Sequence, residues 1–212
     1  MDYKTFSGFT TTLFATTILS LSSLASADEV ARPLDYSKQW LFHTNVESLS
    51  IDDAVAQEQG VDSSAAVVNF EGEYFFTKSI SSNMGIGVII YDDKNSFSQQ
   101  TESRFGGDRD NSSSDARAFP VFVDVGYKKF FGSETPAYAT VRAGVATLLA
   151  SERAIGNCSN CRSEDIDIDA GAYVLVGTGV NFSSFWGLGI HYKQYVSGDL
   201  ENAFGLNATF MY

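Results

Sequence analysis

The last stretch of the chain constrains its fold more than any other. Residues 204–212 alternate with a period of two, which is the period of an extended strand. One face carries Phe204, Leu206, Ala208, Phe210 and Tyr212, and the other carries Gly205, Asn207, Thr209 and Met211. An apolar strand with an open edge invites aggregation, whereas a barrel in a bilayer pairs its last strand with its first. The stretch therefore predicts the closing strand of a membrane barrel.

The same alternation recurs along the chain. With the terminal stretch it gives eight segments, at about 38–50, 66–76, 83–91, 117–130, 137–149, 165–182, 185–195 and 204–212. In each, one face is apolar and the other mixes glycine with polar and isolated charged residues, which suits a narrow lumen. We predict an all-β fold: an eight-stranded antiparallel transmembrane β-barrel with up-and-down meander order. The alternative is a soluble β-sandwich or a lipocalin-like barrel, which would bury its apolar face.

The N-terminus has the features of a secretory signal peptide over residues 1–27. Lys4 provides a positive start, an apolar core follows, and Ala25-Ser26-Ala27 precedes a cleavage site between Ala27 and Asp28. The alternative is a buried N-terminal helix. The mature chain, 28–212, begins with a polar periplasmic lead-in at 28–37. It carries no apolar run of about 18 residues, so no helix in it is expected to span a membrane.

Composition narrows the function classes. The chain has 14 Lys+Arg against 26 Asp+Glu, a net charge of −12, which argues against nucleic acid as a partner. Four long loops, expected to be extracellular, lie at about 52–65, 92–116, 151–164 and 196–201, and short turns alternate with them. Aromatic residues cluster near the short turns and the C-terminus, which predicts an interfacial girdle on the periplasmic side. They are Trp40, Phe42, Phe76, Tyr127, Phe130, Phe131, Tyr138, Phe182, Phe185, Trp186, Phe210 and Tyr212.

Taken together, the signal-like start, the eight strands, the four long loops and the aromatic ending resemble the OmpA-like and opacity-protein-like eight-stranded outer-membrane β-barrels. The resemblance is one of pattern over the mature chain. It implies a location in the cell outer membrane after Sec-type export, with outer-membrane lipid and lipopolysaccharide as partners. It also implies that the barrel assembly machinery reads Phe210 and Tyr212 as an assembly signal, although the family's usual last residue is Phe. We expect a monomer.

The lumen of an eight-stranded barrel is just wide enough for side chains to fill it. Its inward-facing ionisable candidates are His43, Glu47, Glu71, Glu73, Asp124, Lys128, Arg142, His191 and Lys193. If the turn centres on Ser133, Asp124 lies opposite Arg142. Because buried charges need partners, we predict a structural network of lumen ion pairs that includes Asp124, Arg142, Glu71, Glu73, Lys128 and Lys193. The alternative is a gate for protons or small ions.

Two further groups of residues could carry chemistry. Cys158 and Cys161 lie in the third long loop, and a disulfide is the default in an oxidising compartment. A redox pair or a metal site is the alternative there. Asp165, Asp167 and Asp169 share one face near the outer rim, where they form a solvated acidic rim or bind divalent cations. No catalytic residue, cofactor or metal site is assigned.

The function expected from these features is non-enzymatic. Loops of an outer-membrane surface protein would mediate surface contact, adhesion or envelope integrity, with a host or a neighbouring cell as partner. The loop 92–116 is rich in Ser, Asn, Gly and Asp and is expected to be mobile. Two alternatives remain: a barrel enzyme that modifies lipid or lipopolysaccharide, and a narrow ion-conducting pore. His191 is expected to face inward with no nearby serine, which disfavours the enzyme.

Overall fold

The computed structural model describes residues 39–101, 110–132, 137–156, 161–182 and 186–211. The predicted signal peptide with its Ala27–Asp28 cleavage site and the lead-in at 28–37 lie outside the described residues. So do Cys158, Phe185 and Tyr212.

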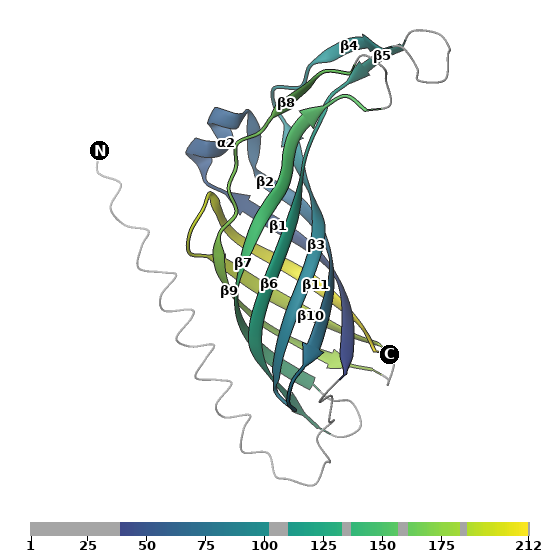
Figure 1. Cartoon of the computed structure of the whole chain (residues 1–212), viewed down its shortest axis with the longest axis vertical. Coiled ribbons are helices and arrows are strands. Elements are labelled where there is room, and N and C mark those ends of the chain that lie inside the picture. Colours follow the sequence, from purple (N-terminus) through teal and green to yellow (C-terminus); the bar gives the residue numbers. More distant parts are fainter. Residues whose placement is uncertain (1–38, 102–109, 133–136, 157–160, 183–185, 212) are drawn as a thin grey trace, which may run out of the picture. The chain divides into compact units, whose positions relative to one another are not determined.

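Eight long strands form a closed barrel (Figure 1). They are β1 (Trp40–Ile51), β2 (Val61–Phe75), β3 (Ile80–Asp93), β6 (Asp115–Phe131), β7 (Ala137–Ala154), β9 (Ala172–Asn181), β10 (Trp186–Tyr195) and β11 (Leu200–Met211). Each strand pairs antiparallel with the barrel strand that follows it, and β11 returns to β1. The all-β, eight-stranded antiparallel meander is therefore confirmed.

Smaller elements gather at one end of this barrel, which we call the long-loop end (Figure 1). They are the helix α2 (Asp53–Gln59), the paired strands β4 (Ser98–Thr101) and β5 (Asp110–Ser113), and β8 (Ser163–Asp165), which pairs with β7. We call the opposite end the short-turn end. No helix among the described residues has both the length and the apolar character needed to cross a membrane.

The terminal stretch closes the ring, as its alternation predicts. β11 pairs with β10 on one side and with β1 on the other, from Leu41 opposite Met211 to Ile51 opposite Leu200. The strand begins at Leu200 rather than 204, and β2 begins at Val61 rather than 66. The predicted loop 52–65 therefore contains α2 and the start of β2. Asp62, Ser63 and Ser64 give that start no apolar face by which it could be recognised.

The outward faces are apolar and exposed along every barrel strand. Val46, Phe70, Ile86, Val125 and Leu206 are 56–62% exposed, although each lies within a strand. The residues between them face the lumen, and many are polar yet buried, as Asn69 and Asn83 are. A water-soluble barrel has the reverse arrangement, because apolar surface is driven out of water. The exposed band is the face that a bilayer would cover.

One predicted strand is wrong in its first half. The segment 166–170 is not a strand, and Ile166 and Ile168 are buried in the interior rather than directed outward. Asp167 and Asp169, which belong to the predicted acidic face near the outer rim, are exposed. The alternation in this segment comes from one side packing onto the barrel mouth while the other meets solvent, not from membership of the barrel wall.

Inward glycines make room for the large side chains that fill the lumen. Gly205 lies opposite both Glu47 and His191, and a Cβ built on it would lie 2.7 Å from Glu47 Cγ and 2.7 Å from His191 Cε1. Gly179 lies opposite Tyr138, whose ring would be 2.6 Å from the added atom. Because these separations are far below van der Waals contact, each large side chain rests on a neighbouring glycine.

The substitution Gly205→Val tests this packing. We expect a loss of about 1–3 kcal/mol of unfolding free energy, because an overpacked interior forces neighbours out of position. The denaturant midpoint of the refolded chain, followed by tryptophan fluorescence, measures the loss. Ala208→Val, on the outward face of the same strand, should leave the midpoint unchanged. Equal midpoints for the two variants would contradict the packing.

Candidate functional site

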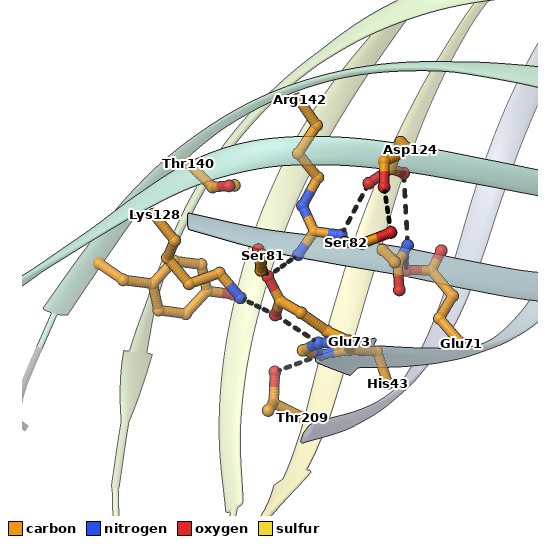
Figure 2. Close-up of polar contacts among 12 residues, drawn as sticks. His43, Glu71, Glu73, Ser81, Ser82, Asp124, Lys128, Thr140, Arg142 and Thr209 are labelled. Carbon is orange, nitrogen blue, oxygen red and sulfur yellow. Dashed lines mark hydrogen bonds and ion pairs between the residues drawn. The ribbon is translucent and has the colours of Figure 1, made fainter. Parts of the chain in front are cut away.

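The most connected group in the lumen is Glu73, on β2, whose side chain is fully buried (Figure 2). It forms ion pairs with Arg142 on β7 and with Lys128 on β6. The Ser81 hydroxyl donates a hydrogen bond of 2.7 Å to Glu73 Oε1, and His43 Nε2 lies 2.9 Å from Oε2. One carboxylate thus joins four strands, β1, β2, β6 and β7, and also contacts β3 through Ser81.

Arg142 connects this group to Asp124 on β6. Its Nη1 lies 3.3 Å from Asp124 Oδ1, and the Tyr173 hydroxyl donates a bond of 2.8 Å to Asp124 Oδ2. The two charged residues are not directly opposite each other: Asp124 faces Gly144, and Arg142 faces Gly126. The expected turn centre at Ser133 is therefore wrong by one residue. The ion pair forms diagonally, because the long arginine side chain spans the offset.

A second buried group surrounds Glu47 on β1. Lys193 Nζ lies 3.2 Å from each of its carboxylate oxygens, and His191 Nε2 lies 2.9 Å from Oε1. Asn69 on β2 donates a hydrogen bond of 3.0 Å to the same oxygen. This cluster links β10 to β1 and β2. His191 is thus engaged inside the barrel rather than directed toward the outer face, where a lipid-modifying catalyst would need it.

Glu71 differs from the other lumen carboxylates because its contacts are with amides. Asn45 donates to one of its oxygens, and Asn83 donates to the other at 2.8 Å. Beside it lies a cavity of about 30 Å³ that Arg142, His191 and Asn207 also line. That volume holds only a very few water molecules. The described part of the lumen is therefore filled by side chains at this level and leaves no space for an open channel.

Aromatic rings lie against the two buried lysines. Lys128 Nζ lies 4.9 Å from the ring centre of Tyr138, and Lys193 Nζ lies 5.2 Å from that of Tyr173. Such contacts stabilise an ammonium group that has lost its water. Tyr138 therefore belongs to the lumen, and so does Phe130, which packs against Tyr138, Phe75 and the buried Leu41. Their expected place in the outer girdle is wrong.

The outer face at the short-turn end carries other rings. The rings of Phe182 and Trp186 stack with their centres 4.8 Å apart, and the ring centres of Trp40 and Phe42 are 6.4 Å apart. Phe210 is half exposed on the same face. Its predicted partner in the assembly signal, Tyr212, is outside the described residues, so that signal stays a prediction.

The interior changes character toward the long-loop end, where an apolar cluster fills the barrel mouth. We call it the apolar plug. Its buried members are Leu49, Ile51, Ala56, Val61, Ala65, Val67, Ile89, Tyr91, Ala116, Ala118, Ile166, Ile168, Leu200 and Ala203. They come from the barrel wall, from α2 and from the segment before β9. Sequence reasoning missed this plug, although the alternation of isoleucine with aspartate at 165–169 was its signal.

Arg153 on β7 ties the elements around the apolar plug together. The residue is 4% exposed, and its Nε lies 2.7 Å from Asp93 Oδ1 at the end of β3. Its Nη2 donates to the backbone carbonyl oxygens of Gln59 and Gly60, at 3.0 and 3.1 Å, where α2 ends. Glu164 lies 3.6 Å from Nη1. The guanidinium thus provides a donor for the Gln59 carbonyl at the helix C-terminus, and it joins the amides of Lys94 and Asn95 at the Gly60 carbonyl.

Acidic side chains at this end hold backbone groups. Asp52 Oδ1 accepts from the amides of Ala54 and Val55 and caps α2. Asp199 Oδ2 accepts a bond of 2.7 Å from the Asp169 amide, and the Asp199 amide donates to the Asp169 carbonyl. Among the described residues, no group of three metal-ligating side chains could hold a metal ion. Cys158 is outside the described residues, so its pairing with Cys161, which is not free, stays a prediction.

Comparisons with known proteins give structural matches only. No family model and no curated protein matches the chain. Similar solved structures include Ail, the attachment invasion locus protein of Yersinia pestis, in complex with the heparin analogue sucrose octasulfate. The identity is 13% over 82% of this chain and 97% of that one, with a TM-score of 0.41.

Two further barrels are similar. The N-terminal β-barrel domain of Pseudomonas aeruginosa OprF has 11% identity over 84% of this chain and 100% of that one, with a TM-score of 0.38. Neisserial surface protein A has 9% identity over 82% and 96%, with a TM-score of 0.42. The assignment of the barrel rests on the strand pairing itself.

The substitution Glu73→Gln tests the first cluster. It leaves Arg142 and Lys128 without their shared carboxylate, so we expect a loss of about 3–5 kcal/mol in unfolding free energy. Adding Lys128→Met should recover part of that loss, because one uncompensated charge is removed. Glu152→Gln breaks the partly exposed Arg117–Glu152 pair and should cost at most about 1 kcal/mol. If Glu73→Gln costs no more than Glu152→Gln, the cluster is not what stabilises the lumen.

The substitution Arg153→Met tests the long-loop end. Methionine keeps an apolar stem but loses the hydrogen bonds to Asp93 and α2, which are worth about 1.5–3 kcal/mol each when one partner is charged. We expect protease cleavage within 53–60 to accelerate at least about tenfold while the barrel strands stay protected. Mass spectrometry of timed digests locates the cuts. Arg162→Met, at a side chain that is 62% exposed, should not change the cleavage rate; the same acceleration in both variants would argue against the Arg153 contacts.

Proposed function

We propose that the chain is a non-enzymatic barrel of the outer membrane whose long-loop end makes contacts with other surfaces. The observation that carries this proposal is the inverted distribution of polarity. All eight barrel strands carry exposed apolar side chains, and these surround a buried set of ion pairs. That arrangement is stable only where a hydrocarbon phase covers the outside.

The packed lumen favours a surface function over transport. Two ion-pair clusters and their aromatic neighbours occupy the interior, and the apolar plug fills the mouth beyond them. A conducting path would need to break several charge contacts at once. The long-loop end is also held together by Arg153, so it presents a preorganised surface. Preorganisation lowers the entropic cost of binding a partner.

Charge on that surface limits the chemistry of the partner. Exposed acids at the long-loop end include Asp53, Glu58, Asp92, Asp115, Asp165, Asp167, Asp169 and Glu201. Of the exposed basic residues there, Lys94 and Arg162 pair with Asp62 and Glu164. A neutral or cationic surface, of a host or a neighbouring cell, fits this charge distribution, and a polyanionic one does not.

Membrane insertion is tested by expressing the full chain in a Gram-negative host. We expect an outer-membrane band whose gel mobility changes on heating, and protease cuts confined to the long-loop end.

Cells that express the chain should adhere to positively charged and neutral surfaces more than the parent strain does, with salt weakening adhesion to the positive one. The acid-to-amide variants of Asp165, Asp167 and Asp169 should lose that salt-sensitive part. An unchanged lipid A mass profile and silent planar bilayers complete the expected result. A band whose mobility does not change on heating, together with recovery of the protein in the soluble fraction, would refute insertion. An altered lipid A mass profile would favour an enzyme.

A further inference from the structure

A groove of about 710 Å³ crosses the outward face of the barrel near the short-turn end. We call it the β9–β11 groove. It is lined by side chains from β1, β7, β9, β10 and β11, among them Thr44, Ala137, Thr178, Leu188, Ile190 and Ala208. Among the described residues, no charged side chain lines it. An even belt of projecting side chains would be expected within the exposed apolar band, but the surface is concave at this position.

The strand register explains why the surface is hollow here. Thr44, Ala208, Leu188, Val180 and Ala137 are successive cross-strand neighbours across five strands. Four of them have short side chains, whereas Leu188 is 47% exposed and projects between the two short pairs. Two residues nearer the short-turn end, the neighbouring row is aromatic, with Phe42, Phe210 and Trp186 exposed by 44–50%.

The opposite bank of the trough is aliphatic. Val46, Leu206 and Ile190 are cross-strand neighbours two residues nearer the long-loop end, and they are 46–62% exposed. Rows that are two residues apart on a strand are separated by about 6.6 Å. On β1 and β11, the short side chains of Thr44 and Ala208 therefore form a trough between two projecting banks, and Leu188 bounds this trough at β10.

We propose that the β9–β11 groove binds one acyl chain of a phospholipid from the membrane leaflet at the short-turn end. This inference rests on the proposed function, since it needs the barrel to be in a bilayer. A narrow trough whose described lining is uncharged matches a single flexible hydrocarbon chain. The aromatic row beside it places the groove in the leaflet of that end, because aromatic side chains prefer the membrane–water interface.

A second copy of the chain fits the groove less well. The barrel is convex, so a neighbouring barrel would rest on the two projecting banks and leave the trough between them empty. Empty apolar space forfeits the contacts of its lining atoms. An acyl chain fills the same space without requiring a matching protein surface. The site is thus a position of preferred lipid occupancy within the outer face.

The test fills the trough without adding charge. The double variant Thr44→Leu/Ala208→Leu and the control Ala143→Leu, on the outward face of β7 outside the groove, are purified as full-length barrels in detergent. Native mass spectrometry then counts phosphatidylethanolamine molecules retained after stepwise delipidation. We expect the wild type and the control to retain one molecule, and the filled variant to retain it about tenfold more weakly, because the chain loses apolar contact along the trough.

A second measurement needs no purification in detergent. With Trp40 replaced by Phe, Trp186 beside the groove reports on vesicles that contain a small fraction of lipid brominated in its acyl chains. At equal lipid composition, bromine should quench the Trp186 fluorescence more strongly in the barrel with the unfilled groove than in the filled variant.

Equal retention and equal quenching in filled and unfilled barrels would overturn the proposal. So would a dimer that the filled variant converts to a monomer, because the occupant would then be a second copy. A chain that never inserts would instead refute the proposed function on which the inference rests.

Discussion

A closed ring of eight strands must be filled from within, and the rest of the structure depends on that constraint. The space between the walls admits side chains only where the opposite position is small, as Gly205 is beneath Glu47 and His191. The side chains that fill it are charged, so they must compensate one another. Counted over the described strands, the lumen carboxylates Glu47, Glu71, Glu73 and Asp124 face Lys128, Arg142 and Lys193. A near balance of charge is what allows a polar interior inside an apolar exterior.

The same contacts reinforce the seam of the ring. The β1–β11 ladder joins the first and the last strand of the barrel, which are the two farthest apart in the sequence. His43 Nδ1 on β1 lies 2.9 Å from Thr209 Oγ1 on β11, while its other ring nitrogen contacts Glu73. The seam therefore shares a side-chain network with β2, β6 and β7. Opening the seam would therefore remove the Thr209 contact of the same histidine that contacts Glu73.

The sequence predicted what depends on local periodicity and missed what depends on register. Alternation identified all eight strands and their outward faces, since a strand's two faces are set by odd and even positions alone. The same parity places Tyr138 inside, next to outward Ala139 and Val141. The girdle prediction was wrong for Tyr138 because it relied on the closeness of this residue to a turn and not on its position in the alternation. The Asp124–Arg142 alignment is wrong by two residues, because Asp124 pairs with Gly144 and alternation alone does not determine the register between β6 and β7. Ile166 and Ile168 follow the alternating pattern of a strand. They are buried, however, because they pack onto the barrel mouth, and that neighbour is known only from the three-dimensional structure.

The interior has two zones, and their order has a functional consequence. Ion pairs occupy the half nearer the short-turn end, and the apolar plug occupies the half nearer the long-loop end. An ion that entered past the apolar plug would first lose its hydration in an apolar layer and then meet charges that are already paired. Two dissimilar barriers in series disfavour conduction more than either alone. What remains available for interaction is therefore the outside of the molecule: the acidic surface that Arg153 holds together, and the outward apolar wall with its trough of short side chains.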